Sequence, residues 1–398
     1  MRPALLSASL AALVAGATLS GAPAQAQADF RSCLAGLKSK AAAKGISGET
    51  FDSATASLQP DMKVLELQGN QPEFKTPIWD YLAMLVDDER VQDGRAGMQR
   101  WGSALAAAES RYGVERHIIA GVWGVESNFG KDLGGRPLVQ SLTTLVCYSD
   151  RRRDFYLGEL MATLKIIENG DIDPAKLTGS WAGAFGQTQF MPTTYQRLAV
   201  DLDGDGRRDI VDSAPDALGS TANFLRKAGW QQGVPWGFEV RVPAGVTPGG
   251  RKAKKPLSSW ASSGVTRMDG RPLSGEYGAG LIMPAGRDGP AFLVTKNFDA
   301  IFSYNGAESY ALAISVLSDR LRGGSGVQAE WPTDDPGLTR AQRRELMALL
   351  GRRGYDVGEP DGRIGQKTRD AIKDVETKLG MKATGRPGGR VLEALRRG

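Results

Sequence analysis

Apolar residues recur every three or four positions through most of the first 230 residues, the spacing of one helix face. The segments Gly102–Tyr112 and Arg116–Ser127 show this spacing clearly, and residues 218–228 repeat it. From residue 234 to about 300 the pattern changes, because WGFEVRVPAG alternates like a strand and Gly, Pro and Ser become frequent. Residues 309–321 return to helical spacing. The pattern therefore predicts a mainly α (α+β) chain with a small β-containing part.

One carboxylate interrupts the apolar run GVWGVESNFG, residues 121–130, where only Glu126 can carry a charge. Helical spacing places three apolar residues on its face: Ile119, Val122 and Trp123. We therefore expect a partly desolvated carboxyl group with a raised pKa, which suits a general acid such as sugar-cleaving enzymes use. The alternative is a helix-end glutamate paired with an arginine. Gly130 fits the C-cap of this helix.

The first 28 residues have the composition of an export signal. Arg2 precedes an apolar run over residues 4–19, and small residues ending at Ala28 offer a cleavage site. No cysteine stands at the end of the run, so we expect no lipid anchor, and no later apolar run approaches the ~20 residues of a membrane span. These features predict a soluble protein exported to the periplasm.

Two cysteines, Cys33 and Cys147, follow this signal. In an oxidising compartment a single pair of cysteines is typical of a disulfide. The alternative is two buried free thiols. We expect the disulfide, because the chain has an export signal.

Composition excludes several kinds of chemistry. His117 is the only histidine, which excludes a zinc site built on paired histidines, and no G-x-S-x-G elbow accompanies it for a serine–histidine triad. The chain has neither a Walker loop nor a G-x-G-x-x-G turn that opens a helix after a strand. A net charge of +5, with no basic run interleaved with aromatic residues, argues against nucleic acid as a partner.

The stretch DLDGDGRRDIVD, residues 201–212, has the spacing of an EF-hand calcium loop. The candidate ligands are Asp201, Asp203 and Asp205, the Arg207 carbonyl at position 7, Asp209 through water, and Asp212 at position 12. Two departures lower the expected affinity: position 12 is Asp and not Glu, and position 8 is Arg208. The alternative is a solvated, aspartate-rich turn. A bound Ca²⁺ would brace the loop and take no part in catalysis.

Five motifs in order resemble the lytic murein transglycosylase B family. They are QPEFKTPIWDYL (71–82), GVWGVESNFG (121–130), SWAGAFGQTQFMP (180–192), AVDLDGDGRRDIVDS (199–213) and NFDAIFSYNGAESYALA (297–313). The resemblance implies a lysozyme-like helical catalytic domain, with Glu126 as its single catalytic acid/base and a calcium loop after the third motif. The implied sugar-binding residues are Tyr81, Ser180, Gln189, Phe190, Tyr304 and Asn305.

The reaction implied by this resemblance is cleavage of the β-1,4 bond between N-acetylmuramic acid and N-acetylglucosamine in peptidoglycan. Ordinary glycosidases use two carboxylates, but the motif around Glu126 holds one. In the family, the muramoyl C6 hydroxyl attacks C1 of its own sugar and leaves a 1,6-anhydro end. Well-oriented intramolecular groups reach effective molarities of about 10⁵–10⁸ M, so this attack can outrun water. No cofactor is expected for catalysis.

The C-terminal part resembles a small three-helix peptidoglycan-binding domain, through GYDVGEPDGRIGQKTRDAI at residues 354–372. It departs from that family at Val375-Glu376, where Phe-Gln is usual. Residues 323–337 have the composition of a linker. We expect a signal peptide (1–28), a catalytic domain (29–322), this linker, and a binding domain (338–398) that tethers the enzyme to its polymer.

Peptidoglycan glycan strands are the expected partner, and other cell-wall enzymes are further candidates. The residues leave two alternative functions open. A hydrolytic lysozyme-like muramidase would use the same Glu126 but release a reducing muramic acid. A non-catalytic peptidoglycan-binding protein would keep the C-terminal domain but would not need Glu126 together with Ser180 and Gln189.

Overall fold

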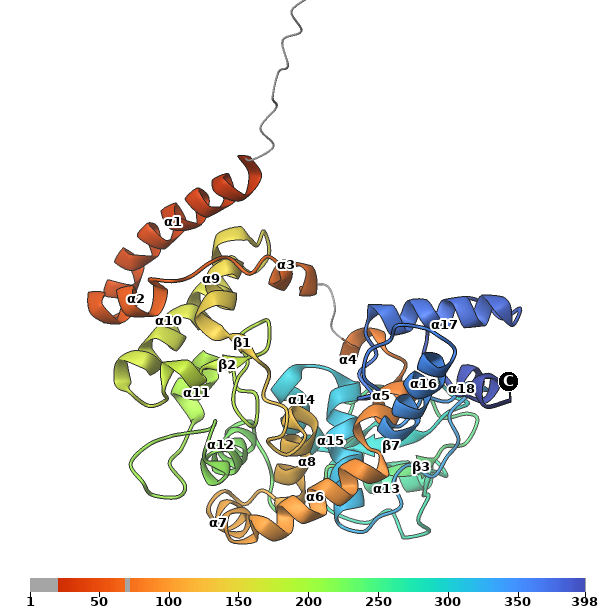
Figure 1. The fold of residues 1–398 in the computed structure, drawn as a ribbon. Coiled ribbons are helices and arrows are strands. Elements are labelled where there is room, and N and C mark those ends of the chain that lie inside the picture. The colour runs from red at the N-terminus through yellow and green to blue at the C-terminus, as the bar shows by residue number, and fades with distance from the viewer. Residues whose placement is uncertain (1–20, 69–71, 398) are drawn as a thin grey trace, which may run out of the picture.

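The computed structural model describes residues 21–68 and 72–397 (Figure 1). Residues 1–20 of the predicted signal peptide lie outside the described residues, and residues 21–28 belong to the first helix. No helix in the described ranges is both long and apolar enough to cross a membrane. The chain is mainly helical with a small antiparallel sheet, which confirms the predicted fold class.

Helices and strands occur in the following order. The N-terminal half contains α1 (Gly21–Ala42), α2 (Gly48–Thr55), α3 (Lys63–Leu67), α4 (Pro72–Lys75), α5 (Ile78–Leu85), α6 (Asp88–Arg100), α7 (Gly102–Tyr112), α8 (Arg116–Ser127), β1 (Arg136–Pro137), α9 (Leu138–Tyr148), α10 (Arg153–Asn169), the 3₁₀ turn η1 (Pro174–Lys176), β2 (Thr178–Gly179) and α11 (Pro192–Leu198). The C-terminal half contains α12 (Ala214–Lys227), β3 (Gly237–Arg241), β4 (Lys255–Pro256), α13 (Leu257–Ser262), β5 (Thr266–Arg267), β6 (Gly278–Ile282), β7 (Ala291–Val294), α14 (Lys296–Asn305), α15 (Glu308–Leu321), α16 (Arg340–Arg352), α17 (Gln366–Lys378) and α18 (Gly389–Arg397).

Helix α8 runs through the largest hydrophobic core and packs closely against α15. Glycines on α8 permit the approach. A Cβ at Gly121 would lie 2.9 Å from the Ile314 carbonyl oxygen of α15, and one at Gly124 would lie 2.9 Å from Leu317 Cδ2 of α15. The last turn of α8 is therefore held against α15, and this packing determines where Glu126 lies.

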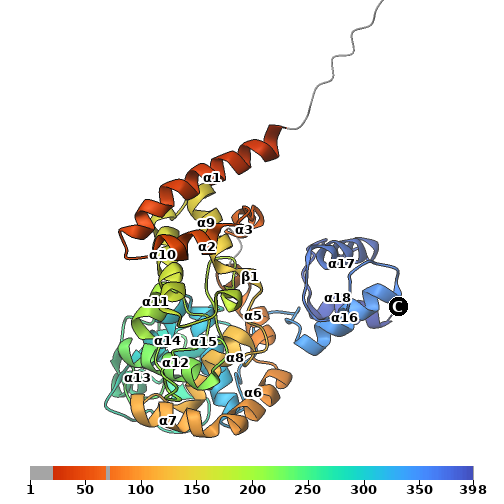
Figure 2. The ribbon, with the colours of Figure 1, turned by 60° about the vertical axis from the view of Figure 1, so that its left-hand side comes forward.

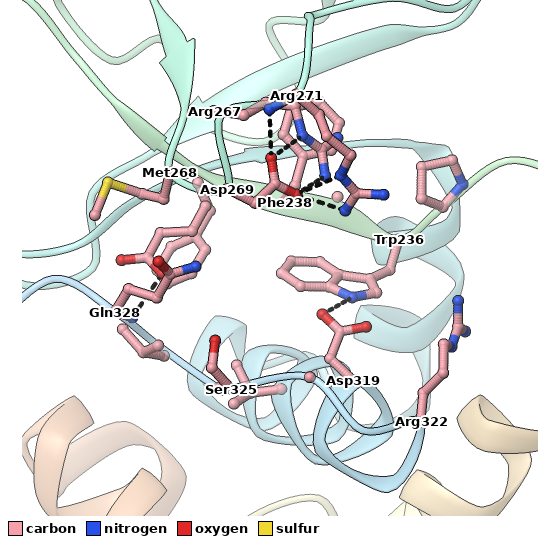
Figure 3. A pocket seen from close by; sticks show the side chains of 18 of the residues that line it. Trp236, Phe238, Arg267, Met268, Asp269, Arg271, Asp319, Arg322, Ser325 and Gln328 are labelled. Atoms are coloured by element: carbon pink, nitrogen blue, oxygen red, sulfur yellow. Dashed lines mark hydrogen bonds and ion pairs between the residues drawn. The ribbon is translucent and has the colours of Figure 1, made fainter.

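The β-containing part is an antiparallel sheet with strand order β4-β6-β7-β3-β5. Its central pairing places Phe238 of β3 opposite Leu293 of β7, and Leu281 of β6 also lies opposite Leu293. These side chains form a small core with Trp260 of α13. On the side of α15 lies a cavity of about 510 Å³ lined by Trp236, Phe238, Asp319 and the segment after α15 (Figure 3).

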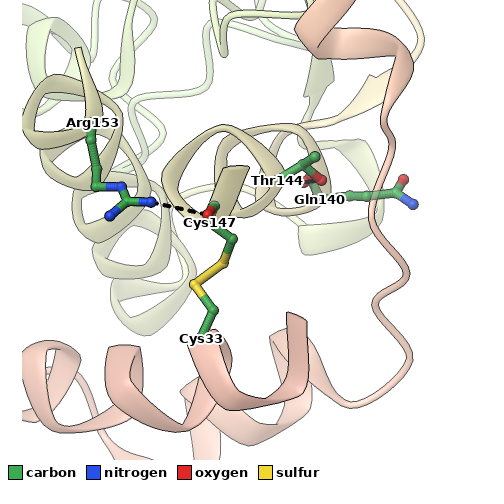
Figure 4. The surroundings of a disulfide bond; sticks show 5 residues. All are labelled: Cys33, Gln140, Thr144, Cys147 and Arg153. Atoms are coloured by element: carbon green, nitrogen blue, oxygen red, sulfur yellow. Dashed lines mark hydrogen bonds between the residues drawn. A yellow bond between two sulfur atoms is a disulfide. The ribbon is translucent and has the colours of Figure 1, made fainter. Parts of the chain in front are cut away.

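A disulfide joins Cys33 of α1 to Cys147 of α9, with the two Cα atoms 5.9 Å apart (Figure 4). The two residues are separated by 114 positions along the chain. The Arg153 guanidinium donates a hydrogen bond of 3.1 Å to the Cys147 carbonyl oxygen at the end of α9. The disulfide therefore links the first helix to α9. Helices α9 and α10 form the second hydrophobic core together with the segment around Phe185 and Phe190.

Helices α16, α17 and α18 form a three-helix unit beside the main body (Figure 2). They enclose a separate core around Leu346, Ile372 and Leu392. Glu376, the departure from the expected Phe-Gln, is 5% exposed. Its carboxylate accepts hydrogen bonds from the Thr384 amide (2.6 Å), the Thr384 hydroxyl (2.6 Å) and the Gly385 amide (2.8 Å). These hydrogen-bond donors, from the turn before α18, compensate the carboxylate of Glu376 for its loss of contact with water.

The segment with linker composition, residues 323–337, is packed on the main body. Val327 and Trp331 contact the largest core, and the amides of Gln328 and Ala329 each donate a hydrogen bond of 2.8 Å to Glu239 of β3. Gly, Pro and Ser make regular secondary structure unfavourable, but they do not prevent tertiary contacts. In this structure the connecting segment is therefore held against the main body.

Candidate active site

Glu126 lies in the last turn of α8 and is half-buried, as the lone carboxylate in an apolar helix predicts. The helix ends at Asn128 and not at the predicted Gly130. Asn128 has a left-handed conformation (φ 51°), and its amide donates to the Gly124 carbonyl oxygen at 3.1 Å. Asparagine tolerates this conformation better than most residues, so it serves as the C-cap. Gly130 instead lets the chain pass Gln187, whose Oε1 would be 2.7 Å from a Cβ there.

The Tyr310 hydroxyl of α15 donates a hydrogen bond to Glu126 Oε1. Burial, followed by the nearby negative charge of Glu126, raises the pKa of Tyr310 well above its ordinary value. The phenol therefore stays protonated and acts as a donor. Tyr310 lies inside the fifth sequence motif, but sequence reasoning did not select it. Only the packing of α15 on α8 reveals that this tyrosine faces Glu126.

An aromatic wall extends from Tyr310 away from Glu126. Tyr304 of α14 stacks on Tyr310 with ring centroids 6.3 Å apart, and Phe224 of α12 lies 4.5 Å from Tyr304. The Tyr304 hydroxyl donates to the Thr188 carbonyl oxygen at 2.7 Å. Burial and the charge of Glu126 raise the pKa of Tyr304 well above its ordinary value. Asn305, which ends α14 beside this wall, is exposed.

Two predicted sugar-binding side chains are buried in the structure. Phe190 is 1% exposed and packs behind Tyr304, with ring centroids 5.8 Å apart. Tyr81 is 6% exposed and belongs to the largest core. Motif membership does not distinguish a residue that lines a cleft from one that supports its wall. Both side chains support the surroundings of Glu126 in this structure, and their contact with a sugar stays a prediction.

The third motif forms a loop that is fastened to the end of α8. The Trp123 indole donates to Gln187 Oε1 at 3.1 Å, Gln187 Nε2 donates to the Val211 carbonyl oxygen at 3.1 Å, and the Ser127 hydroxyl donates to the Gln187 carbonyl oxygen. Gln187 therefore joins this loop to α8 and to the aspartate-rich stretch of residues 201–212, hereafter the acidic loop.

Ser180 and Gln189, which are both half-buried, lie at the two ends of this loop. Ser180 Oγ accepts the Ala184 amide at 3.0 Å. Gln189 has a left-handed backbone (φ 50°) and donates through Nε2 to the Leu133 and Gly186 carbonyl oxygens, at 3.1 and 2.9 Å. Backbone strain of this kind is common at binding sites and persists only where the surroundings hold it.

Four carboxylates gather in the acidic loop: Asp201, Asp203, Asp205 and Asp216, each with one oxygen within 4.8 Å of the others. The fourth differs from the prediction, because Asp212 pairs with Lys176 instead. Asp216 lies in the first turn of α12, where its carboxylate accepts the amides of Leu202 (2.7 Å) and Asp209 (2.8 Å). Burial raises the pKa of Asp216 to about 6. A hard divalent cation such as Ca²⁺ suits a set of carboxylate oxygens.

Asp209 and Arg207, two other residues of the predicted ligand set, make hydrogen bonds within the loop, and the bond of Arg207 involves its amide and not the carbonyl predicted to bind the ion. Asp209 is 6% exposed, and one of its oxygens accepts the amides of Val211 and Asp212, each at 2.9 Å. The Arg207 amide donates to Asp205 at 2.8 Å. The loop therefore resembles an EF-hand at positions 1, 3 and 5. It differs from an EF-hand at its end, because the fourth carboxylate comes from Asp216 in the first turn of α12.

The cavity of Figure 3 is not part of this site. It is lined by Glu115, the N-cap residue of α8, whereas Glu126 is eleven residues later at the other end. At 1.5 Å per residue the separation along the helix is about 16 Å. None of the predicted sugar-binding residues lines this cavity.

Asp319 in this cavity allows a pH-dependent test of stability. The Trp236 indole donates to its carboxylate at 3.1 Å, and burial raises the pKa of Asp319 to about 6. Since the ordinary value is 3.8, the folded state holds the proton more tightly, and ionisation costs stability as the pH rises from about 4 to 6. We expect Asp319→Asn to raise the melting temperature at pH 7.5 but not at pH 3.5. Asp288→Asn on an exposed loop is the control, and an equal shift of Asp319→Asn at both pH values would contradict the assignment.

Comparison with known proteins agrees with this geometry. The model of the transglycosylase SLT domain matches residues 29–319, and that of the putative peptidoglycan binding domain matches residues 339–395. The chain is 34% identical over 264 residues to membrane-bound lytic murein transglycosylase B of Escherichia coli K12, covering 64% of this chain and 72% of that protein.

Among solved structures, SltB3 of Pseudomonas aeruginosa in complex with NAG-anhNAM-pentapeptide is 44% identical, with a TM-score of 0.74 over 92% of this chain and 99% of that chain. The E. coli lytic transglycosylase Slt35 in complex with calcium is 30% identical, with a TM-score of 0.64 over 74% of this chain and 92% of that chain.

Proposed function

The chain belongs to the transglycosylase SLT family and is a peptidoglycan lytic transglycosylase, and from that premise we propose that Glu126 is its single acid/base. The observation that carries the proposal is the position of this carboxyl group. It is half-buried at the end of α8 and is oriented by the hydrogen bond from the Tyr310 hydroxyl, beside the aromatic wall of Tyr304.

One carboxyl group suffices because its proton returns within each turnover. Glu126 gives its proton to the glycosidic oxygen as the bond from that oxygen to the muramoyl C1 breaks. The resulting carboxylate then takes the proton of the muramoyl C6 hydroxyl as this oxygen attacks C1. The ring closes as a 1,6-anhydro sugar, and Glu126 is protonated again. Tyr310 keeps the carboxyl group in place throughout, since its raised pKa makes it a donor and not a competing base.

Ser180, Gln189, Tyr304 and Asn305 are proposed to contact the glycan. Ser180 and Gln189 come from the loop fastened to α8, and Tyr304 and Asn305 come from the end of α14. Tyr304 presents an aromatic surface that is partly accessible, and Asn305 is exposed beside it. Aromatic surface with a few fixed polar groups is the usual composition of a binding cleft.

The reaction is tested by digesting purified sacculi and identifying the ends of the soluble fragments by mass spectrometry. The proposal predicts fragments that end in 1,6-anhydromuramic acid. Reducing muramic acid ends would instead support a hydrolytic muramidase, and no release of fragments would support a binding protein without activity.

We also propose that the acidic loop binds a structural Ca²⁺ through Asp201, Asp203, Asp205 and Asp216. Asp201→Ala should lower the melting temperature in calcium and change it much less in chelator. At a calcium concentration 100 times the dissociation constant, binding contributes about 2.7 kcal/mol. Asp212→Ala is the matched control, because Asp212 lies in the same loop but pairs with Lys176. An Asp201→Ala shift that is the same in both conditions would contradict the calcium site.

The remaining proposals concern export and domain organisation. Residues 1–28 direct export to the periplasm, where peptidoglycan lies and where a disulfide such as Cys33–Cys147 is stable. Residues 29–322 form the catalytic domain, residues 323–337 a connecting segment, and residues 338–398 a domain that binds the glycan polymer.

A further inference from the structure

The three-helix C-terminal unit contacts the main body through arginines that face carboxylates. Arg344 pairs with Glu89 of α6, and Arg386 pairs with Asp80 of α5. Arg340, the first residue of α16, pairs with Asp87, whose side chain is 2% exposed. Asp87 is therefore covered in this arrangement, whereas the side chains of the Arg344–Glu89 pair are 39% and 38% exposed.

Asp87 accepts hydrogen bonds from the first turns of two helices that belong to different parts of the chain. As the N-cap of α6, its Oδ1 accepts the Arg90 amide at 2.8 Å. Its Oδ2 accepts the Arg340 amide, in the first turn of α16, at 3.0 Å. The Arg340 guanidinium adds contacts of 3.1 Å from Nε to Oδ2 and from Nη2 to Oδ1. A carboxylate with this many donors holds both helix ends in one fixed arrangement.

Arg340 also reaches the end of the catalytic helix. Its Nη1 donates to the Asn128 side-chain oxygen at 3.2 Å. Asn128 is the left-handed C-cap of α8, two residues after Glu126. From within the main body, the Arg90 guanidinium donates to the Gly124 carbonyl oxygen, two residues before Glu126. Two arginines joined through Asp87 therefore hold the turn that carries the acid/base.

We propose that Arg340 is a positioning residue for Glu126: by bonding Asp87 and Asn128 together, the C-terminal unit fixes the last turn of α8 and so contributes to bond cleavage as well as to wall binding. The inference rests on the proposed role of Glu126. A guanidinium suits this task because its planar fork serves two acceptors at once, which a single ammonium does not. Positioning matters because a misplacement of about 1 Å can cost about 10²-fold in rate.

The test compares variants of the full chain on short soluble glycan strands, where binding to the polymer plays no part. Arg340→Ala removes both contacts. Asn128→Gly removes only the acceptor, and glycine adopts a φ of 51° without strain. Arg344→Ala is the matched control, because Arg344 lies on the same helix and pairs with the same part of α6 but does not bond Asn128. Small-angle X-ray scattering measures whether the C-terminal unit stays docked.

We expect Arg340→Ala and Asn128→Gly each to lower kcat about 10-fold with KM within about twofold, since the contact orients the acid/base and does not bind substrate. The double variant should be no slower than Arg340→Ala alone. Arg340→Lys should stay docked in scattering yet show the reduced kcat. Arg344→Ala should keep kcat within about twofold of the parent.

Three results would overturn the proposal: full kcat in both Arg340→Ala and Asn128→Gly, an equal loss in Arg344→Ala, or a loss confined to KM. Asn128→Gly keeps the test decisive if Arg340→Ala does not fold. Failure of the acid/base assignment itself is separate, because it would appear as retained activity in Glu126→Gln whatever the Arg340 variants do.

Discussion

Glu126→Gln is expected to lower kcat by at least about 10⁴-fold, because one group supplies both the general acid and the general base and each such role contributes about 10²–10⁴-fold. The amide has nearly the same shape and can still accept the Tyr310 hydrogen bond, so the fold and glycan binding should be retained. An amide does not deliver a proton to the leaving oxygen or take one from the C6 hydroxyl. The measurement is release of soluble fragments from sacculi, with the melting temperature and sacculus binding recorded beside it.

Glu115→Gln is the matched control for this variant, because Glu115 lies at the other end of the same helix and pairs with Arg322. It should leave kcat within about twofold of the parent, since it is about 16 Å from Glu126 along α8. Fragment release by Glu126→Gln at a tenth of the parent rate or more would show that another group supplies the proton.

Removing the disulfide is expected to cause the largest loss of stability. The double variant Cys33→Ser/Cys147→Ser opens a loop of 114 residues, for which chain entropy predicts a loss of about 4–5 kcal/mol. The loss should appear in denaturant unfolding under oxidising conditions. In reducing buffer the parent and the variant should unfold at the same denaturant concentration, which serves as the control. Equal stability under oxidising conditions would mean that the bond does not constrain the unfolded chain.

The sequence indicated which residue carries the chemistry of the site, but it did not indicate the contacts that support that residue. Glu126 stood out because a charge in an apolar helix is costly without a purpose, and the motifs around it are specific. Tyr310 did not stand out in the sequence, because its contact with Glu126 depends on how α15 packs against α8. Likewise, the motifs that contain Phe190 and Tyr81 gave no indication that both side chains are almost fully buried.

Helix boundaries account for two of the differences. Gly130 is the usual C-cap residue, yet Asn128 ends α8 because asparagine also tolerates a left-handed backbone. Asp216 replaces Asp212 in the carboxylate cluster because α12 begins after Ser213, which brings the first turn of that helix to the loop. Spacing rules assume the standard length of a loop, and only the folded chain shows where the next helix starts.

The arrangement of the C-terminal unit was the least predictable feature. Composition indicated a linker but not its contacts: Trp331 packs on the largest core, Ala329 bonds Glu239, and Arg340 covers Asp87. The Ala329–Glu239 bond joins residues 90 positions apart and the Arg340–Asp87 bond joins residues 253 apart, and surface arginines and aspartates carry no sequence signal for their partners.

Digestion of sacculi by the parent enzyme in oxygen-18 water tests the central claim most directly. If Glu126 alone acts as acid and base and the C6 hydroxyl is the nucleophile, the product is a 1,6-anhydromuramoyl end whose oxygens all come from the substrate. Mass spectrometry should then find no oxygen-18 at the new ends. Reducing muramic acid ends that each carry one oxygen-18 would show that water attacks C1, and would contradict the account.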